Sequence, residues 1–416
     1  MKKFIALAMA VLMVFSMMSF AAADDQTLTI VTWDATTTPY LIAQKEAFEA
    51  SHPGVTIEYV DVASQDYAVK TTTMLAGGDT SDIFMVKEIT DNLKWQEAGY
   101  SEPLNAYMEA SGYDVSGFAG IEGSYAIDGQ QYALPFRSDF WVLFYNKDLF
   151  DAAGVAYPTN DMTWDEYADL AIKMTDADKG VYGTHYHTWL SAVVNWDVAD
   201  GVNTLIDGNY DDLAYYYDLY NKIEEAGACM AYTELKAAGL HYSGAFGNGN
   251  IAMMPMGYWY VSTLIANIAS GEYNVKNWGI TAVPHAEGVA AGSSFGNLTG
   301  VMMNAKSANK DLAWEYMAWL AGEEGSQATA SVGARPAWVS EDVASVMASV
   351  EGFPTDDASK EALVPVFVGV EIPASEHSSE ISSILNEVHS LVMTHEYEVE
   401  EGVKEMNERV QDLLEG

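Results

Sequence analysis

The sequence has little of three features that would each point to a class of protein. It contains one cysteine, Cys229, so no disulfide can form within the chain. Only 19 residues are Lys or Arg, against 60 that are Asp or Glu, and the formal net charge is −41. Such a charge repels phosphate backbones and anionic lipids, so we expect neither nucleic acid nor a membrane surface as a partner. The acidic residues are spread along the chain, and for this reason the charge alone identifies no cationic ligand.

Long hydrophobic runs are also missing after the start of the chain. No later stretch reaches the length of about 20 apolar residues that a membrane span requires. Residues 1–23 predict a secretory signal peptide, because two lysines precede a short apolar stretch and Ala21-x-Ala23 supplies the small residues at the cleavage site. No cysteine stands at that site, so we expect no lipid anchor. The expected location is the periplasm or the cell exterior, with the cleaved chain soluble.

Alternating strand and helix patterns fill the rest of the chain and predict an α/β fold. Apolar and alternating runs predict strands over residues 28–33, 55–60, 83–86 and 141–145. The first three strands are joined by helical patterns, which predicts a parallel sheet covered by helices. After the fourth strand, Gly154 ends one helix and Thr163 begins the next, where Glu166 completes a capping box. Two amphipathic helices close the chain.

Several short motifs follow one another in a fixed order along the sequence. They are GGDTSDIF at 77–84, DGQQYALP at 128–135, YNKDLF at 145–150, TWDE at 163–166, F-x-x-G-x-x-A-M from 246, NKDLAWEY at 309–316 and GARPA at 333–337. Together they resemble the extracellular solute-binding proteins that feed ABC importers, the group that includes maltose-binding protein. The resemblance covers nearly the whole chain after the signal peptide.

This resemblance implies an α/β fold of two lobes, each a sheet flanked by helices. The chain of such a protein crosses between the lobes three times, and here we expect the crossings near residues 135–139, 295–299 and 322–325. The N-terminal lobe then takes residues 24–137 plus 298–322, and the C-terminal lobe takes residues 138–297 plus 323–416. Ligands of the family bind in the cleft between lobes, which agrees with binding at the carboxyl ends of strands in open α/β sheets.

The same resemblance selects the residues expected to contact a ligand. Sugars require a flat aromatic face and planar polar groups that bind hydroxyls. Trp259 matches the family's stacking tryptophan, and Asp139 falls where maltose-binding protein carries a sugar-contacting carboxylate. A salt bridge or a hinge hydrogen bond would also explain the polar candidates near the crossings. The full set of expected ligand-binding residues is Trp33, Asp34, Glu88, Arg137, Asp139, Trp259, Asn297 and Arg335.

One segment departs from the maltose-binding pattern. Residues 85–88 read MVKE at the third strand, where maltose-binding protein has a tryptophan and an acid–base pair. The departure leaves the broader class, carbohydrates, as the expected ligand.

Three short patterns suggest enzyme or metal chemistry, and each lacks a part. GSSFG at 292–296 has the spacing of a hydrolase nucleophile elbow, but a strand pattern follows it where that elbow needs a helix. His185-x-His187 has no third ligand at metal-site spacing, so we expect a polar loop. The D-x-D-x-G run from Asp176 places glycine at the fifth position of a calcium loop. We therefore predict a protein that is not an enzyme, with no catalytic residue, metal or cofactor.

The predicted function is that of a substrate-binding subunit of an ABC transporter. It would capture a mono- or oligosaccharide between its lobes and deliver it to the transmembrane permease subunits, and we expect it to be a monomer. Two alternatives stay open: a carrier of polyamines or other small cations, which the acidic composition favours, and a secreted carbohydrate-active enzyme.

Overall fold

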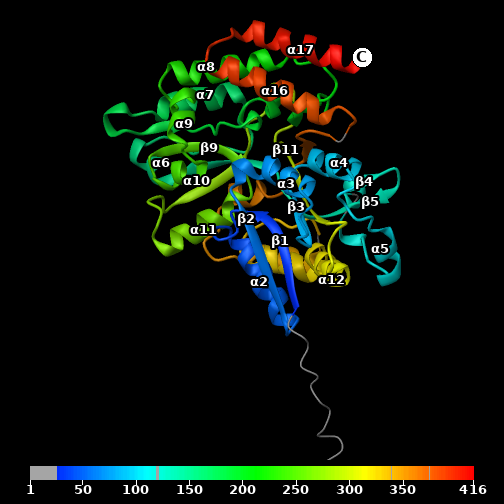
Figure 1. The fold of residues 1–416 in the computed structure, drawn as a ribbon. Helices are drawn as coiled ribbons and strands as arrows, with labels where there is room; N and C mark the ends of the chain where they lie inside the picture. Colours follow the sequence, from blue (N-terminus) through cyan, green and yellow to red (C-terminus); the bar gives the residue numbers. More distant parts are fainter. Residues whose placement is uncertain (1–25, 119–120, 339, 374) are drawn as a thin grey trace, which may run out of the picture.

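Two halves, each built around its own sheet, make up the protein (Figure 1). The computed structural model describes residues 26–118, 121–338, 340–373 and 375–416, so the expected signal peptide lies outside the described residues. Among the residues that are described, no helix is both long enough and apolar enough to cross a membrane. The α/β architecture predicted from the sequence is confirmed.

The N-terminal half contains a five-stranded sheet. Its order is β2 (Val55–Val62), β1 (Gln26–Trp33), β3 (Ile83–Val86), β12 (Leu298–Met303) and β6 (Ala133–Ser138). The predicted parallel arrangement is confirmed for the first three strands, since β1 pairs in parallel with both β2 and β3. The last two strands run antiparallel to their neighbours, because they belong to segments that pass between the halves.

Helices cover both faces of this sheet (Figure 1). Pro39 begins the first of them, at a position where its missing N–H would have had no helical partner. The helices of this half are α2 (Pro39–Ser51), α3 (Tyr67–Ala76), α4 (Ile89–Glu97), α5 (Asn105–Ser111), α12 (Lys310–Ala321), α13 (Glu323–Ala330) and α14 (Glu341–Ala348), and a short hairpin of β4 (Ala126–Ile127) and β5 (Gln130–Gln131) lies beside α5.

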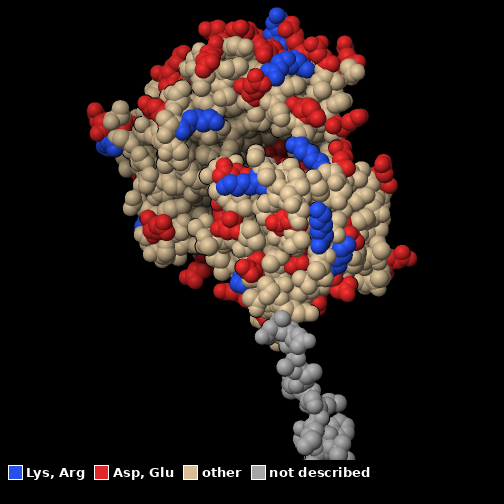
Figure 2. Space-filling view, viewed as in Figure 1, with Lys and Arg blue, Asp and Glu red and all other residues tan. Residues whose placement is uncertain are grey.

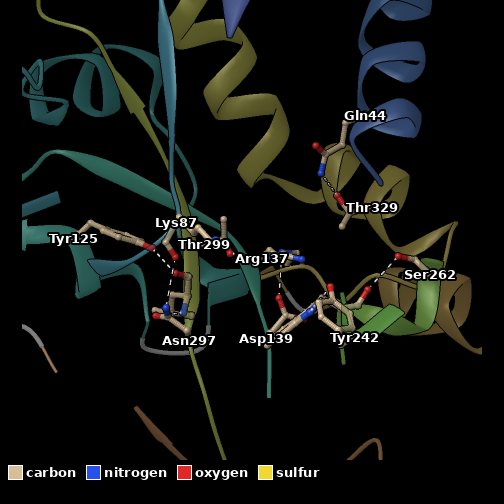
Figure 3. Close-up of polar contacts among 12 residues, drawn as sticks. Gln44, Lys87, Tyr125, Arg137, Asp139, Tyr242, Ser262, Asn297, Thr299 and Thr329 are labelled. Atoms are coloured by element: carbon tan, nitrogen blue, oxygen red, sulfur yellow. Dashed lines mark hydrogen bonds and ion pairs between the residues drawn. The ribbon is translucent and has the colours of Figure 1, made fainter. Parts of the chain in front are cut away.

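The last two of these helices differ from the expected division of the chain. Residues 323–416 were expected in the C-terminal lobe, yet Ala330 and Val343 are buried in the same core as β1 and β3. The Gln44 side chain of α2 also donates a hydrogen bond of 2.8 Å to Thr329 Oγ1 of α13 (Figure 3). We therefore propose that the third crossing lies beyond Ala348 and not near residues 322–325.

The C-terminal half contains a four-stranded sheet in the order β10 (Trp278–Ala282), β7 (Trp141–Asn146), β9 (Ile251–Gly257) and β8 (Tyr182–Thr184). A separate large core of aromatic and aliphatic side chains packs around it. The helices of this half are α6 (Lys147–Ala153), α7 (Trp164–Met174), α8 (Leu213–Glu225), α9 (Tyr232–Ala238), α10 (Tyr242–Gly247), α11 (Tyr260–Ser270), α15 (Asp357–Glu361), α16 (Ser378–Met393) and α17 (Val399–Glu415).

The helix signals read from the sequence are confirmed in this half. Gly154 ends α6 in the left-handed conformation, with φ of 64°, where a side chain would be strained. Thr163 and Glu166 form the predicted capping box at the start of α7, and each side chain accepts the other residue's backbone N–H, at 3.3 and 3.0 Å.

Two crossings run side by side between the halves. The first links β6 to β7, and the second links β11 (Ser293–Gly296) to β12, with β11 paired in parallel to β13 (Phe367–Val370). The Asp139 backbone N–H donates a 3.1 Å hydrogen bond to the Asn297 carbonyl. A Cβ at Gly296 would lie 1.9 Å from the Asp139 carbonyl oxygen, so only glycine permits this approach of the two chains.

Candidate ligand-binding cleft

A hollow opens between the two halves, and the space-filling view shows it across the middle of the molecule (Figure 2). The carboxyl ends of β1 and β3 reach it from the N-terminal half. The start of α11 and the loop after β8 reach it from the C-terminal half. The charges of Asp34 and Lys87 in the N-terminal half affect the pKa of His241 in the C-terminal half. These parts of the two halves therefore face each other.

The N-terminal wall begins with Trp33 and Asp34 at the end of β1. Trp33 is only 8% exposed, because its ring packs edge-on against Tyr67 with centroids 4.9 Å apart. Asp34 adopts a left-handed backbone with φ of 49°, and its Oδ1 accepts a hydrogen bond from the Ser64 N–H at 3.2 Å. Trp33 therefore offers little surface to a solute, while Asp34 holds the turn that follows the strand.

Lys87 follows β3 and lies next to Trp33. Its Nζ donates to the carbonyl and hydroxyl oxygens of Ser64, at 3.0 and 2.8 Å, and lies 5.7 Å from the Trp33 ring centroid. Burial lowers the pKa of Lys87, and the nearby carboxylates of Glu88 and Asp34 oppose that shift. Lys87 is not among the ligand-binding residues expected from the sequence, although it adjoins Glu88 at the same strand end.

Two of the predicted residues, Arg137 and Asp139, form a buried ion pair at the first crossing. Arg137 Nε lies 3.1 Å from Asp139 Oδ2, and the two side chains are 8% and 3% exposed. The Arg137 guanidinium also donates to Thr299 Oγ1 at 3.1 Å (Figure 3). It stacks over the Tyr40 ring, at 4.7 Å from the ring centroid. Burial raises the pKa of Asp139, against the opposing effect of the guanidinium groups of Arg137 and Arg335. These contacts account for Arg137 and Asp139 as an ion pair at the junction of the halves, while the Arg335 guanidinium lies over the Phe140 ring, 4.8 Å from its centroid.

Glu88 and Asn297 meet at the second crossing. The Asn297 amide donates to the Glu88 carboxylate, and its oxygen accepts from the Leu298 N–H at 2.8 Å. Tyr125 donates to the Leu298 carbonyl at 2.8 Å, beside the same crossing (Figure 3). Glu88 is exposed to water, and the protein around it, followed by the charge of Glu371, raises the pKa of its carboxyl above the usual range.

The C-terminal wall is aromatic. Trp259 is half-buried just before α11, its Nε1 donates to Tyr242 Oη at 3.2 Å, and its ring meets Trp141 edge-on at 5.8 Å. Trp189 lies 6.3 Å from the Trp259 ring and 5.4 Å from Tyr242. The side chains of Trp189, Tyr242 and Trp259 each keep part of their surface accessible, as a stacking platform requires.

Histidines complete this wall, and the sequence analysis missed their role. Both residues lie in the loop that follows β8, but His185 is buried there, with 2% of its surface exposed. His187 packs edge-on against Trp189 at 4.3 Å and lies 5.7 Å from the exposed His241. Burial lowers the pKa of His185 to about 4 and that of His187 to about 3, with a smaller contribution from His241. All else being equal, these two imidazoles are neutral at pH 7.

Two imidazole nitrogens of this wall have unused hydrogen-bonding capacity. Within the described residues, neither His185 Nε2 nor His187 Nδ1 has a hydrogen-bond partner, and both atoms are buried. A buried polar atom without a partner costs free energy, which a ligand hydroxyl would recover. The signal in the sequence was the H-x-H pair with Trp189 close behind it, but His241 and Tyr242, which also contact His187, lie more than 50 residues away.

Glu371 is a second cleft residue that sequence reasoning missed. It follows β13 in the C-terminal half, and its Oε1 accepts a hydrogen bond from Trp141 Nε1 at 2.8 Å. Burial raises the pKa of Glu371 to about 7, against the effect of that hydrogen bond. No motif surrounds this residue, so nothing in the sequence distinguished it from the other acidic residues.

The nucleophile-elbow spacing around Ser294 proves to be a strand. Ser294 lies in β11, its hydroxyl donates to the Trp141 carbonyl at 2.7 Å and accepts from the Trp141 N–H at 3.1 Å, and β12 follows where an elbow requires a helix. Across the described ranges, no group of three or more His, Cys, Asp or Glu side chains has an arrangement that could hold a metal ion.

Comparison with known proteins agrees with this arrangement. The family model of bacterial extracellular solute-binding proteins matches residues 34–327. A putative binding protein of Brucella suis biovar 1 (strain 1330) is 26% identical over 333 residues, 75% of each chain. The lactose-binding protein of Rhizobium radiobacter is 25% identical over 328 residues, 74% of this chain and 73% of that one.

A solved structure extends the likeness to three dimensions. A sugar transporter from Rhizobium etli, in an open conformation, is 40% identical and superimposes with a TM-score of 0.75. The match covers 92% of this chain and 99% of the other. The two sheets, the cleft between them and these similarities lead to one conclusion: the chain belongs to the family of bacterial extracellular solute-binding proteins.

Proposed function

We propose that the protein is the solute-binding subunit of an ABC importer and that its solute is a carbohydrate. The observation that carries the proposal is the C-terminal wall of the cleft, where half-buried aromatic rings adjoin two neutral imidazoles with unpartnered nitrogens. Aromatic faces suit the C–H side of a sugar ring, and neutral hydrogen-bonding groups suit its hydroxyls. The sugar transporter of Rhizobium etli and the lactose-binding protein of Rhizobium radiobacter support the same class of ligand.

The proposed site combines the C-terminal wall with the predicted residues of the other half. Trp259 would stack on a sugar ring, and the hydroxyls would reach His187 on one side and the acidic groups Asp34 and Glu88 on the other. The same space would be bordered by four further predicted residues, which are Asn297, Arg335 and the Arg137–Asp139 pair. Trp33 contributes little surface, since only 8% of it is exposed.

The mechanism follows from a ligand that contacts both halves at once. Such a ligand binds the closed arrangement more tightly than the open one, so it shifts the equilibrium toward closure. The closed monomer would then dock on the transmembrane permease subunits and release its solute there. The chemistry requires no covalent step.

A thermal-shift screen tests the class of ligand. Lactose, maltose and mannitol are compared with spermidine and putrescine, and one or more of the sugars is expected to raise the melting temperature. Ligand at 100 times its dissociation constant adds about 2.7 kcal/mol to the free energy of unfolding by mass action. Because Asp34, Glu88 and Glu371 all face the cleft, a polyamine is the competing ligand. A rise in melting temperature with polyamines alone would show that the ligand is a cation and not a carbohydrate.

Two further measurements test the remaining parts of the proposal. Incubation of the pure protein with the same sugars, followed by chromatography, is expected to return them unchanged, and any turnover would favour the secreted enzyme. The intact mass of the exported protein is expected to begin at Asp24 without an acyl group. A retained leader or an added lipid would contradict the proposed free periplasmic or secreted form.

A further inference from the structure

The indole of Trp259 lies flat on the end of strand β9. Gly257 is the last residue of that strand, two positions before the tryptophan. A Cβ added to Gly257 would lie 1.9 Å from Cζ3 of the indole and 2.1 Å from both Cε3 and Cη2. A point beside the rim of the ring would be much nearer to the middle one of three successive ring atoms than to the other two, so these similar distances place the Cβ over the ring. One face of the indole therefore rests on the glycine.

The backbone conformation of Gly257 does not explain why a glycine stands there. Its φ lies outside the left-handed region, so the backbone would accept an alanine without strain. The nearest atoms to the added Cβ all belong to the Trp259 ring. It is therefore the position of the indole that requires a glycine at this end of the strand.

Neighbouring side chains fix the indole in this position and leave its outer face open. Trp141 pairs with Gly257 across β7 and β9, and its ring stands at 88° to the indole, with centroids 5.8 Å apart. Trp259 Nε1 donates its hydrogen bond to Tyr242 Oη at 3.2 Å. Trp189 lies 6.3 Å away and is tilted by 51°, so within the described part of the chain no aromatic ring stacks on the outer face.

Other glycines of the same half lie under rings that are buried. A Cβ at Gly279 would lie 2.5 Å from Cζ of Tyr145, which is 1% exposed, and a Cβ at Gly247 would lie 2.5 Å from Cδ1 of Tyr273, which is 8% exposed. These glycines serve the packing of the core. The Trp259 ring is only half-buried, so its glycine shapes a surface of the cleft.

We propose that Gly257 is a positioning residue for the solute, because it sets the depth and the tilt of the indole face on which a sugar ring stacks. Stacking requires a close and nearly parallel contact between the indole and the C–H side of the sugar. A side chain at position 257 would push the indole toward the cleft and away from Tyr242 Oη. The solute part of this inference rests on the proposed function, but the contact between glycine and indole does not.

A double-mutant cycle tests whether Gly257 acts through the indole. Lactose, maltose and mannitol are titrated calorimetrically into the wild type, Gly257→Ala, Trp259→Ala and the double variant. Gly257→Ala is expected to weaken sugar binding by about fivefold or more. The double variant is expected to bind within about twofold of Trp259→Ala alone, because the added methyl group then meets no ring. Unchanged affinity in Gly257→Ala, or independent losses that add in the double variant, would overturn the inference.

Two further glycines serve as matched controls. Gly279→Ala places a methyl group against a buried ring and is expected to lower the melting temperature while the folded protein keeps its affinity. Gly244→Ala, on α10, meets nothing within 4 Å and is expected to match the wild type in both respects. Any fall in melting temperature caused by Gly257→Ala is expected to disappear when Trp259→Ala is added, so the cycle remains informative even if the single variant folds poorly. A fall that persists in the double variant would contradict the role of the indole.

A measurement without solute separates this inference from the proposed function. In NMR spectra of protein labelled at its tryptophan nitrogens, the Trp259 indole N–H signal is identified by its loss in Trp259→Ala. That signal is expected to shift in Gly257→Ala and to stay in place in Gly244→Ala. A shifted signal with no sugar binding in the wild type would leave the role of Gly257 in placing the indole and remove the carbohydrate. Wild-type sugar affinity and an unmoved signal in Gly257→Ala would leave the carbohydrate and remove the role of Gly257.

Discussion

The two walls of the cleft differ in their charge and in their hydrogen-bond partners. The N-terminal wall is charged, and its cations are already engaged: Lys87 is hydrogen-bonded to Ser64, and Arg137 forms an ion pair with Asp139. The C-terminal wall is aromatic and neutral, and nitrogens of His185 and His187 have no partner in the described residues. A solute that enters the open cleft is therefore expected to make its most favourable contacts with the C-terminal wall. The N-terminal wall contributes contacts when the halves close.

The largest expected effect comes from the charged side. Arg137→Ala leaves the carboxylate of Asp139 buried without its ion-pair partner and is expected to lower the free energy of unfolding by about 3–5 kcal/mol. Denaturant unfolding measures this loss. Arg409→Ala, which breaks a partly exposed pair with Glu387, serves as the control and should cost less than about 1 kcal/mol. Equal losses in the two variants would show that the buried ion pair at the crossing contributes no more stability than an exposed pair.

The tryptophans of the two walls should respond differently to truncation. Trp259→Ala is expected to weaken sugar binding by about 1–3 kcal/mol, because it removes a half-exposed stacking face, and to leave a folded protein. Trp33→Ala is expected to act mainly on stability, since the ring is 8% exposed and packs on Tyr67. Binding calorimetry and thermal melts of both variants separate the effects. If Trp33→Ala abolished binding in a fully stable protein, the stacking platform would belong to the other wall.

Acid should destabilise the C-terminal wall selectively. The pKa of His187 is about 3 in the folded protein, below the value of about 6.5 in an unfolded chain, so the unfolded state binds more protons as pH falls below 6.5. Stability is then lost toward acid pH, by about 2 kcal/mol at pH 5 for this histidine. His187→Phe keeps an aromatic ring and is expected to reduce the loss in urea unfolding between pH 7 and pH 5. His52→Phe, on α2's C-terminal end in the other half, should retain the wild-type loss.

The smallest effect is expected from a single hydroxyl. Tyr242→Phe removes the acceptor of the Trp259 indole N–H, and we expect a loss of about 0.5–1.5 kcal/mol in sugar binding through poorer orientation of the ring. Tyr215→Phe is a matched control, because its hydroxyl bonds to Asp165 at the surface of α8. A loss of the same size in the control would show that orientation of Trp259 contributes nothing.

Much of the fold could be predicted because its signals are local. The apolar run of β3, Gly154 after α6 and the Thr163–Glu166 capping box each depend on a few adjacent residues. The third crossing could not be placed in the same way. Whether α13 packs on one half or the other depends on contacts such as Gln44 with Thr329, which are separated by 285 positions in the chain.

The candidate site also contains residues that sequence motifs indicated and residues that depend on contacts between distant segments. Family motifs led to Trp259, Asp139 and Arg137, which the structure places around the cleft and the crossings. They could not lead to His187 or Glu371, because neither lies in a shared motif and each acquires its environment from distant segments. His187 meets His241 and Tyr242, and Glu371 meets Trp141, only after the C-terminal half has folded.

The N-terminal half is assembled from segments that are far apart in the sequence, and this affects how the chain reaches its native state. Its sheet needs β12, and its core needs residues as far along as Val343, so the half cannot be completed from its first strands alone. Contacts between such distant segments slow folding, because a long loop must close before they form. The C-terminal half draws most of its sheet from one continuous stretch, between β7 and β10. The core of that half also includes α16 and α17, so the contrast concerns the sheets. We therefore expect the sheet of the half whose sequence begins first to be the one that forms last.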